Sequence, residues 1–235
     1  MIKLITCDID GTLIKNYAED LEPSFFELIK KFKKQGVLFV ATSGRQTPNL
    51  KVLFEPVSND ISYISENGAL ITHNNKIIYK SAMEDKLARK LANKILNTPN
   101  FEVLVCSANT TYVIPKRDEF LNHIKNEVKN DITIVNSLDD IKTEILKVSI
   151  YDYTGVTEEK LKHITEEFDK HFNHTVSGLH WYDFMNYNTH KGNAIEILQK
   201  ELNISKDETA AFGDNFNDIE MLKDAKYSFA MEDAH

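Results

Sequence analysis

Apolar and polar positions along residues 1–80 follow a strand, helix, strand order. The strand-like apolar runs span residues 2–8, 37–42 and 61–65. After the first run, apolar side chains from Leu21 to Phe32 recur at helical spacing, with Asp20 as the expected N-cap and Gly36 as the expected stop. This order predicts right-handed βαβ units and a parallel sheet.

A different pattern occupies the middle of the chain. Helices are expected at 84–96, 118–129 and 157–170, and strands at 102–106, 110–115, 145–151, 174–177 and 181–186. Several of these strands are close neighbours in sequence, which is typical of hairpins and predicts an antiparallel or mixed sheet. After His190 the first pattern returns. It predicts helices at 191–202 and 217–223 and strands at 209–213 and 227–230.

Composition excludes several classes of protein. The 235 residues carry a formal net charge of −8, so we expect no partnership with nucleic acid or with anionic membrane surfaces. No apolar run approaches the roughly 20 residues that span a bilayer, and Asp8 interrupts the apolar N-terminus before a secretory signal could be complete. Cys7 and Cys106 lie in strand-like runs, where we expect buried, reduced thiols of a cytoplasmic protein.

The segment Asp8-Ile9-Asp10-Gly11-Thr12-Leu13 is the strongest chemical signal. Positions i and i+2 of a strand face the same way, so Asp8 and Asp10 are expected to point together from the strand's carboxyl end, where open α/β sheets bind ligands. Two carboxylates there repel unless a cation or a shared proton intervenes. A hard divalent cation, Mg²⁺ above all, suits such oxygen ligands. A solvated acidic turn is the alternative.

A second signal, Gly213-Asp214-Asn215-Phe216-Asn217-Asp218, follows another strand-like run. Asp214 would add a third carboxylate to an all-oxygen metal site with room for water and phosphate. Taken alone, the segment could also be a helix N-cap made of Asp and Asn.

Two further positions offer what phosphoryl transfer requires, namely cations and hydrogen-bond donors around a spreading negative charge. Ser43 supplies a hydroxyl, and Gly44 allows a backbone amide to approach closely. Lys191 begins a helix whose N-terminal amides also favour an anion. Each of these is weak evidence by itself. Their order along the chain is informative.

That order, D-x-D-G-T, then Ser43, then Lys191, then G-D-x-x-N-D, resembles the haloacid dehalogenase superfamily. The segments A-T-S-G-R and E-N-G-A are similar to those of its Cof-type phosphatases, which carry a type IIB cap. The resemblance implies an α/β fold. Residues 1–80 and 189–235 would form a Rossmann-like parallel-sheet core, and residues 81–188 an inserted α/β cap that determines substrate specificity.

The resemblance also implies a mechanism through an aspartyl-phosphate. Asp8 would be the nucleophile, and Asp10 the general acid and then the general base. Ser43 and Lys191 would orient and neutralise the phosphoryl group. Mg²⁺ would be held by a carboxylate oxygen of Asp8, the backbone carbonyl of Asp10, and Asp214.

More peripheral roles follow from the same match. Asp218 would support the metal ligands from behind, and Asn217 and Gly44 would contact phosphate. Arg45 and Asn67 lie where similar proteins reach toward substrate. Such proteins usually continue beyond an A-M-x-x-A segment with another strand and helix, so a truncated C-terminus is one expectation for this chain.

The expected activity is hydrolysis of a small phosphomonoester, such as a sugar phosphate or a nucleotide-like cofactor. A phosphosugar mutase, a phospho-signalling receiver and a catalytically silent binder of phosphorylated ligands are the alternatives. Only about thirty residues separate Asp10 from Ser43, too few for a mutase cap there, and receivers are near half this length. The sequence leaves open whether the protein is a monomer or a homo-oligomer.

The presumed cap holds one aromatic segment, His180-Trp181-Tyr182, followed by Asp183. It could close over a ring or a sugar, or it could be an ordinary strand with aromatic packing. The eight histidines form no zinc-binding pattern.

Overall fold

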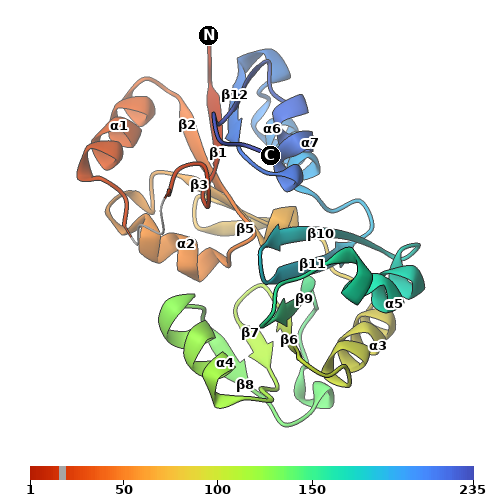
Figure 1. Cartoon of the computed structure of the whole chain (residues 1–235). Coiled ribbons are helices and arrows are strands. Elements are labelled where there is room, and N and C mark those ends of the chain that lie inside the picture. Colours follow the sequence, from red (N-terminus) through yellow and green to blue (C-terminus); the bar gives the residue numbers. More distant parts are fainter. Residues whose placement is uncertain (16–19) are drawn as a thin grey trace. The chain divides into compact units, whose positions relative to one another are not determined.

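The computed structural model describes residues 1–15 and 20–235, which form two compact units. The core unit comprises Met1–Lys80 and Thr189–His235, and the inserted unit comprises Ser81–Asn188. Figure 1 colours the chain from red to blue, so the core unit combines the red and orange segments with the blue ones. None of the helices in the described residues is both long enough and apolar enough to cross a membrane.

A seven-stranded sheet in the order β13-β12-β1-β2-β3-β4-β5 forms the centre of the core unit. Its strands are β1 (Leu4–Asp8), β2 (Leu38–Thr42), β3 (Ser62–Ser65), β4 (Leu70–His73), β5 (Lys76–Lys80), β12 (Thr209–Gly213) and β13 (Tyr227–Ala230). The strands from β13 to β3 pair in parallel, as the sequence pattern predicts. The hairpin of β4 and β5 adds two antiparallel strands that the sequence analysis did not predict.

Helices cover both faces of this sheet. They are α1 (Pro23–Lys34), α2 (Thr47–Leu53), α6 (Lys191–Leu202) and α7 (Ile219–Lys223). Figure 1 shows α1 and α2 on one face and α6 and α7 on the other. Neighbouring strand residues supply the two apolar layers, since Phe39 packs with the α1 and α2 cluster and Val40 with the α6 and α7 cluster.

The start of α1 differs from the sequence-based expectation. Its N-cap is Glu22 rather than Asp20, because Pro23 occupies the first helical turn, where its fixed φ favours the helix and its missing N–H costs nothing. The predicted helix at 217–223 begins with a 3₁₀ turn, Phe216–Asp218, before α7.

The strand register brings the chemical motifs to one edge of the core sheet. Asp8, the last residue of β1, pairs with Thr42, so Ser43 follows directly beside it. Cys7 pairs with Phe212 on the other side, so Asp214 leaves β12 at the same edge. Parallel strands present their carboxyl ends together, and residues far apart in sequence therefore meet there.

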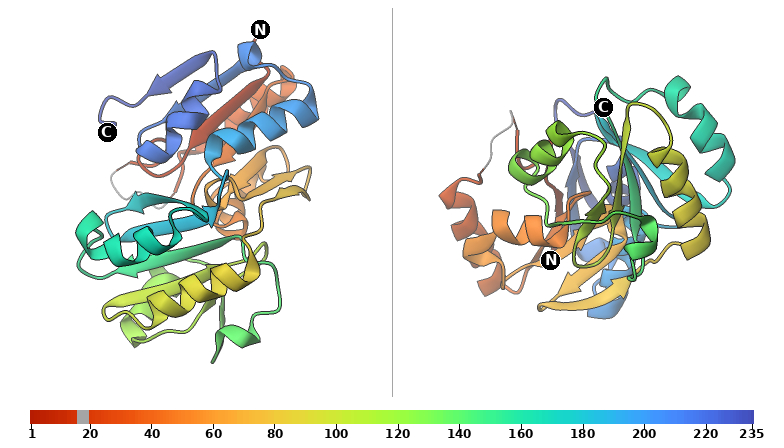
Figure 2. Two further views of the ribbon diagram at one scale, coloured as in Figure 1. Left: turned by 90° about the vertical axis from the view of Figure 1, so that its right-hand side faces the viewer. Right: turned by 90° about the horizontal axis from the view of Figure 1, so that it is seen from below.

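The inserted unit has a six-stranded mixed sheet in the order β10-β11-β9-β6-β7-β8. The strands are β6 (Phe101–Cys106), β7 (Thr111–Val113), β8 (Ile132–Ile134), β9 (Lys147–Asp152), β10 (Phe172–Gly178) and β11 (Trp181–Asn186). The helices are α3 (Asp85–Leu96), α4 (Asp118–Asn122) and α5 (Glu158–Phe168). Figure 2 shows α3 and α5 on one face of the sheet and α4 on the other. Within this six-stranded sheet, β7 and β8 are the parallel pair among the described strands, and the other pairs are antiparallel.

The predicted helix at 118–129 is shorter in the structure. After α4 the chain widens into a π-helical turn, His123–Glu127. Further short 3₁₀ turns lie at Glu55–Val57, Glu66–Gly68, Leu138–Asp140 and Lys206–Glu208.

Candidate active site

The turn after β1 sets the geometry of the site. Asp8 is 5% exposed, and the chain reverses immediately after it, with the Leu13 and Ile14 amides donating to the Ile9 carbonyl. Gly11 has φ +93°, and a Cβ there would lie 2.3 Å from Oδ2 of Asp214. Glycine is therefore required at this position both by conformation and by space.

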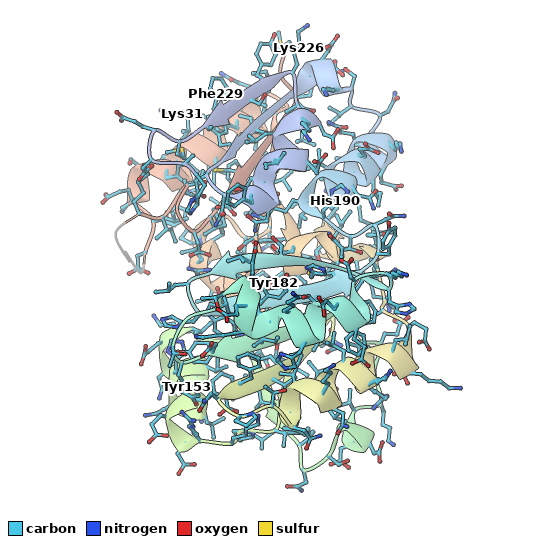
Figure 3. The ribbon with its side chains drawn as sticks, turned by 45° about the vertical axis from the view of Figure 1, so that its right-hand side comes forward. Lys31, Tyr153, Tyr182, His190, Lys226 and Phe229 are labelled. Carbon is cyan, nitrogen blue, oxygen red and sulfur yellow. The ribbon has the colours of Figure 1, made fainter. Side chains whose placement is uncertain are left out.

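Lys191 bridges two of the carboxylates. Its Nζ donates to Oδ1 of Asp8 at 2.5 Å and to Oδ1 of Asp218 at 2.7 Å, and the lysine is 1% exposed. Lys191 is the first residue of α6, and its neighbour His190, marked in Figure 3, caps the helix by accepting from the Asn193 amide at 3.1 Å.

The loop after β12 fixes the other acidic residues. Oδ2 of Asp218 accepts from the amides of Asp214 and Asn215 at 3.0 and 3.1 Å. Oδ1 of Asp214 accepts from the Thr12 hydroxyl at 2.8 Å. Both oxygens of Asp218 are thus engaged within the protein, whereas Asp214 is held from one side.

The charges in this cluster do not balance. Burial raises the pKa of Asp8 to about 7, with the Asp218 charge acting in the same direction and Lys191 opposing both. Burial also lowers the pKa of Lys191, but the charges of Asp8 and Asp218 more than offset this, so its pKa lies above the usual value. Lys191 remains an ammonium, and it neutralises only one of its two carboxylate partners.

The surplus charge and the donor atoms fit a hard cation. Asp8, Asp214 and Asp218 each offer a carboxylate oxygen, and these oxygens all lie within 4.8 Å of one another. Oxygen donors at such spacing suit Mg²⁺. Because Lys191 and two amides already occupy Asp218, Asp8 and Asp214 are the carboxylates best placed to ligate the ion.

Asp10 lies beyond the end of β1 and is not one of the three clustered carboxylates. Its side chain is 54% exposed, and its charge contributes to raising the pKa of Asp8. Because β1 ends at Asp8, strand alternation stops before Asp10 is reached. The carboxylate pairs with Arg45, whose Nε and Nη2 donate to its two oxygens at 2.8 and 2.5 Å. The proposed ligand atom, the Asp10 backbone carbonyl, stays a prediction.

Ser43 and its neighbours line the end of β2. The Ser43 side chain is buried, and its Oγ accepts from the Arg45 amide at 3.1 Å. Its carbonyl accepts from the Asn67 amide at 3.1 Å. A Cβ at Gly44 would lie 3.1 Å from Oδ1 of Asn67, and that oxygen accepts from Nδ2 of Asn217 at 3.2 Å. Four of the predicted phosphate-binding or substrate-binding residues therefore lie close together.

Backbone strain accompanies this arrangement. Glu66, Asn67 and Gly68 have φ values of +52°, +55° and +101° in succession. A non-glycine residue in the left-handed region costs on the order of 1–3 kcal/mol, and such residues tend to occur at functional sites. The strained turn holds the buried Asn67 beside Gly44.

Two residues of the site carried no individual role in the sequence analysis. Thr12 orients Asp214, and its place inside D-x-D-G-T could have indicated this. Asn49 on α2 accepts from Nη1 of Arg45 at 3.1 Å. No sequence signal marks Asn49, because its partner is defined only by the folded loop.

The aromatic segment of the inserted unit divides between two faces of its sheet. Trp181 lies 4.8 Å from the Tyr151 ring and His180 lies 5.6 Å from it, centroid to centroid. Tyr182 is buried on the other face with its hydroxyl 2.6 Å from Nδ1 of His174. Figure 3 marks Tyr182 on the sheet. Strand alternation explains the split, and it agrees with the ordinary packing alternative.

Both cysteines are buried and unpaired with each other. Burial raises the pKa of the Cys7 thiol, and the Asp8 charge raises it further, so the thiol stays protonated and unreactive.

The chain is similar to known proteins over almost its whole length. The family profile of haloacid dehalogenase-like hydrolases matches residues 5–235. The 5-amino-6-(5-phospho-D-ribitylamino)uracil phosphatase YbjI of Escherichia coli is 27% identical over 237 residues, which cover 99% of this chain and 86% of YbjI.

Solved structures share the fold over the whole chain. The structure of SMU.1108c from Streptococcus mutans matches with a TM-score of 0.86 and 26% sequence identity. The match covers 100% of this chain and 89% of the SMU.1108c chain. The haloacid dehalogenase subclass IIB sugar phosphatase BT4131 has a TM-score of 0.83 and 24% identity, with 99% and 88% covered.

Proposed function

The chain belongs to the haloacid dehalogenase-like hydrolases, and we propose that within this family it is a Mg²⁺-dependent phosphatase of small phosphomonoesters. The membership confirms the family resemblance seen in the motifs. One observation carries the proposal: Lys191 faces two buried carboxylates, and a third, Asp214, lies within ligand distance of both. A further cation would relieve the repulsion within such a cluster, and phosphoryl transfer uses one.

Asp8 is the nucleophile in this proposal. One of its oxygens attacks phosphorus, and the bond between phosphorus and the leaving oxygen breaks. The leaving oxygen keeps that electron pair and takes a proton from Asp10, which gives the free alcohol and an aspartyl-phosphate. Splitting the reaction in this way lowers each barrier.

The second half-reaction reverses the role of Asp10. Its carboxylate takes a proton from water while the water oxygen attacks phosphorus. The bond between phosphorus and the Asp8 oxygen breaks, Asp8 returns as a carboxylate, and inorganic phosphate leaves. A single acid/base group thereby serves both steps.

The remaining residues bind and orient the phosphoryl group. Lys191 places a fixed positive charge beside Asp8, and the Ser43 hydroxyl and the Gly44 amide lie at the adjacent strand end. The amide groups of Asn67 and Asn217 border the same place. Mg²⁺, when held by Asp8, Asp214 and the Asp10 carbonyl, would offset the repulsion between carboxylate and phosphate.

The substrate class is a phosphorylated sugar, polyol or nucleotide-like metabolite. YbjI is named for a phosphorylated ribityl compound, and a subclass IIB neighbour is named a sugar phosphatase. The inserted unit is the part that would select among these compounds.

A mutase remains the second enzyme of interest, since both activities pass through a phosphoenzyme. The observation against it is local: the described residues between Asp10 and Ser43 form α1 and β2. A mutase converts one phosphate ester into another, whereas the proposed enzyme releases inorganic phosphate.

The test is a panel of phosphorylated sugars, polyols and nucleotides incubated with the full chain and Mg²⁺, with released phosphate as the readout. We expect turnover that disappears in Asp8→Asn and on chelation of the metal. Undiminished turnover by a clean Asp8→Asn preparation would remove Asp8 from its role. Isomerised ester without free phosphate would replace the phosphatase with a mutase.

A further inference from the structure

We propose that Arg45 is a positioning residue for Asp10, holding the acid/base carboxylate in its working direction rather than serving only to bind substrate. The inference rests on the proposed function, because it concerns the group that gives and takes the proton. It assigns Arg45 a task different from the one its sequence position indicates, and it adds Asn49 as a supporting residue.

The contact between Arg45 and Asp10 is a two-point one. Nε donates to Oδ2 at 2.8 Å and Nη2 donates to Oδ1 at 2.5 Å. Two parallel N–H donors on one carboxylate fix its plane as well as its place, which a single ammonium cannot do.

Arg45 is itself held from three sides. Its amide donates to the Ser43 hydroxyl at 3.1 Å. Its carbonyl accepts from the Glu66 amide at 3.1 Å. Its remaining terminal nitrogen, Nη1, donates to Oδ1 of Asn49, a buried side chain in the first turn of α2. The direction of the guanidinium is therefore set by the loop and the helix.

The size of the interaction argues that its purpose is not stability. The Asp10 side chain is half exposed, and an exposed ion pair contributes about 1 kcal/mol or less to folding. The same exposure leaves Asp10 free to adopt several rotamers when it lacks a partner. A general acid must lie within hydrogen-bond reach of the leaving oxygen. A carboxyl group that changes rotamer is often out of reach, and the rate of proton transfer falls.

The pairing leaves room for the chemistry. A carboxylate has about four lone-pair positions, and a bidentate guanidinium uses two of them. The positions that remain can carry the proton that goes to the leaving oxygen and, in the second step, accept the proton of water. Arg45 has only donors, so it neither supplies nor removes that proton.

Leaving groups of different acidity distinguish positioning from substrate binding. Phenol resembles the tyrosine side chain, with a pKa of about 10, and leaves poorly without a proton, whereas p-nitrophenol is much more acidic and leaves readily. We expect Arg45→Gln to lower kcat/KM for phenyl phosphate at least tenfold more than for p-nitrophenyl phosphate. A lysine at this position retains the positive charge but lacks the two parallel N–H donors of the guanidinium. Arg45→Lys should therefore recover little of the kcat/KM that Arg45→Gln loses.

A double-mutant cycle provides the second readout. If Arg45 acts through Asp10, Arg45→Gln should cost no more than about threefold when Asp10 is already Asn. The supporting change Asn49→Ala should show the same leaving-group preference with a smaller loss.

Lys33→Met is the matched control, because Lys33 pairs with Asp60 at 2.6 Å on the same unit and outside the site. It should leave both rates unchanged. Equal losses on the two esters, or full additivity with Asp10→Asn, would overturn the proposal and return Arg45 to substrate binding. An inactive wild type, or an active Asp8→Asn, would instead overturn the proposed function, so the two failures are distinguishable.

Discussion

Both units of the molecule bury a lysine against an aspartate, and the two pairs are built differently. In the inserted unit, Lys147 lies 3.4 Å from Oδ2 of Asp183, and the Ser177 hydroxyl donates to that oxygen at 2.7 Å. In the core unit, Lys191 meets two carboxylates, with Asp214 nearby.

The difference separates a structural pair from a reactive one. Removing charges from water costs several kcal/mol per ion, and a balanced pair recovers much of that through attraction and hydrogen bonds. An unbalanced cluster recovers less, so the fold tolerates it where another cation completes it. The core cluster, with one lysine among three carboxylates, is thus prepared for a cation, whereas no such carboxylate cluster is found at Lys147 among the described residues.

The largest effect expected from this comparison is on activity. Lys191→Met should lower kcat/KM for p-nitrophenyl phosphate by a factor on the order of 10³, since it removes the fixed charge at the reacting group. Lys147→Met should change that rate by less than about threefold. Each change should destabilise the fold by roughly 3–5 kcal/mol, because each removes the lysine charge from a buried carboxylate. Steady-state kinetics and urea unfolding measure both, and similar activities in the two variants would contradict the distinction.

The next effect is on metal affinity. Asp214→Asn should weaken Mg²⁺ binding roughly 100-fold, because it removes a ligand charge, and without metal it should leave stability equal or higher by relieving repulsion. Asp183→Asn should leave the affinity for Mg²⁺ unchanged and should lower the free energy of unfolding. Calorimetric titration and thermal unfolding with and without Mg²⁺ provide the comparison. Asp214→Asn with unchanged affinity would place the ion elsewhere.

A smaller effect tests the orientation of the ligand. Thr12→Val should weaken the binding of Mg²⁺ about tenfold, because residues that orient a metal ligand contribute 10-fold to 100-fold to metal affinity. Thr72→Val is a matched control, because the buried Thr72 hydroxyl makes no hydrogen bond among the described residues. That control should keep metal affinity and lose no stability. Equal affinities in the two variants would show that Asp214 needs no support.

The last effect concerns pH, and it bears on stability rather than on activity or metal affinity. The pKa of Asp8 is about 7 in the folded protein against 3.8 as a reference, so between these values the folded state binds a proton that the unfolded state has lost. Stability therefore falls as pH rises from about 4 to about 7, by at most about 1.4 kcal/mol per pH unit. Asp8→Asn should lack this slope, and Mg²⁺ should flatten it. Metal-free urea unfolding across this range measures it; parallel curves for both proteins would contradict the assignment.

The sequence predicted most accurately those elements whose local pattern and burial agree. The bounds of α6, β12 and β13 match the expected ones, since each apolar run is bracketed by polar residues or a break. The β4 and β5 hairpin was missed for a physical reason. Its turn, Asn74 and Asn75 with φ of +49° and +59°, lacks the usual glycine, and β5 is largely exposed, so its alternation carries little signal.

The sequence indicated which residues belong to the candidate site better than it indicated which of their side chains contact one another. Strand ends identify Asp8 and Asp214 because the carboxyl edge of a parallel sheet gathers them. The partner of Asp10 was unpredictable, since the turn after Asp8 redirects it toward an arginine 35 positions later. Side-chain pairing across loops depends on backbone details that residue spacing does not encode.

The order of the core sheet also has a consequence for how the protein is made. Leu4 of β1 pairs with Thr209 of β12. The central strand β1 therefore cannot complete its pairing until β12, about 200 residues later in the chain, has been synthesised. Contacts this distant in sequence slow folding, whereas the inserted unit is contiguous and can fold as soon as it emerges. Nascent chains that still lack Lys191 and Asp214 hold Asp8 without its cationic partner and without the third carboxylate of the site, so under the proposed function synthesis itself delays the onset of catalysis. Pulsed hydrogen exchange during refolding should find β6 and β9 protected before β1.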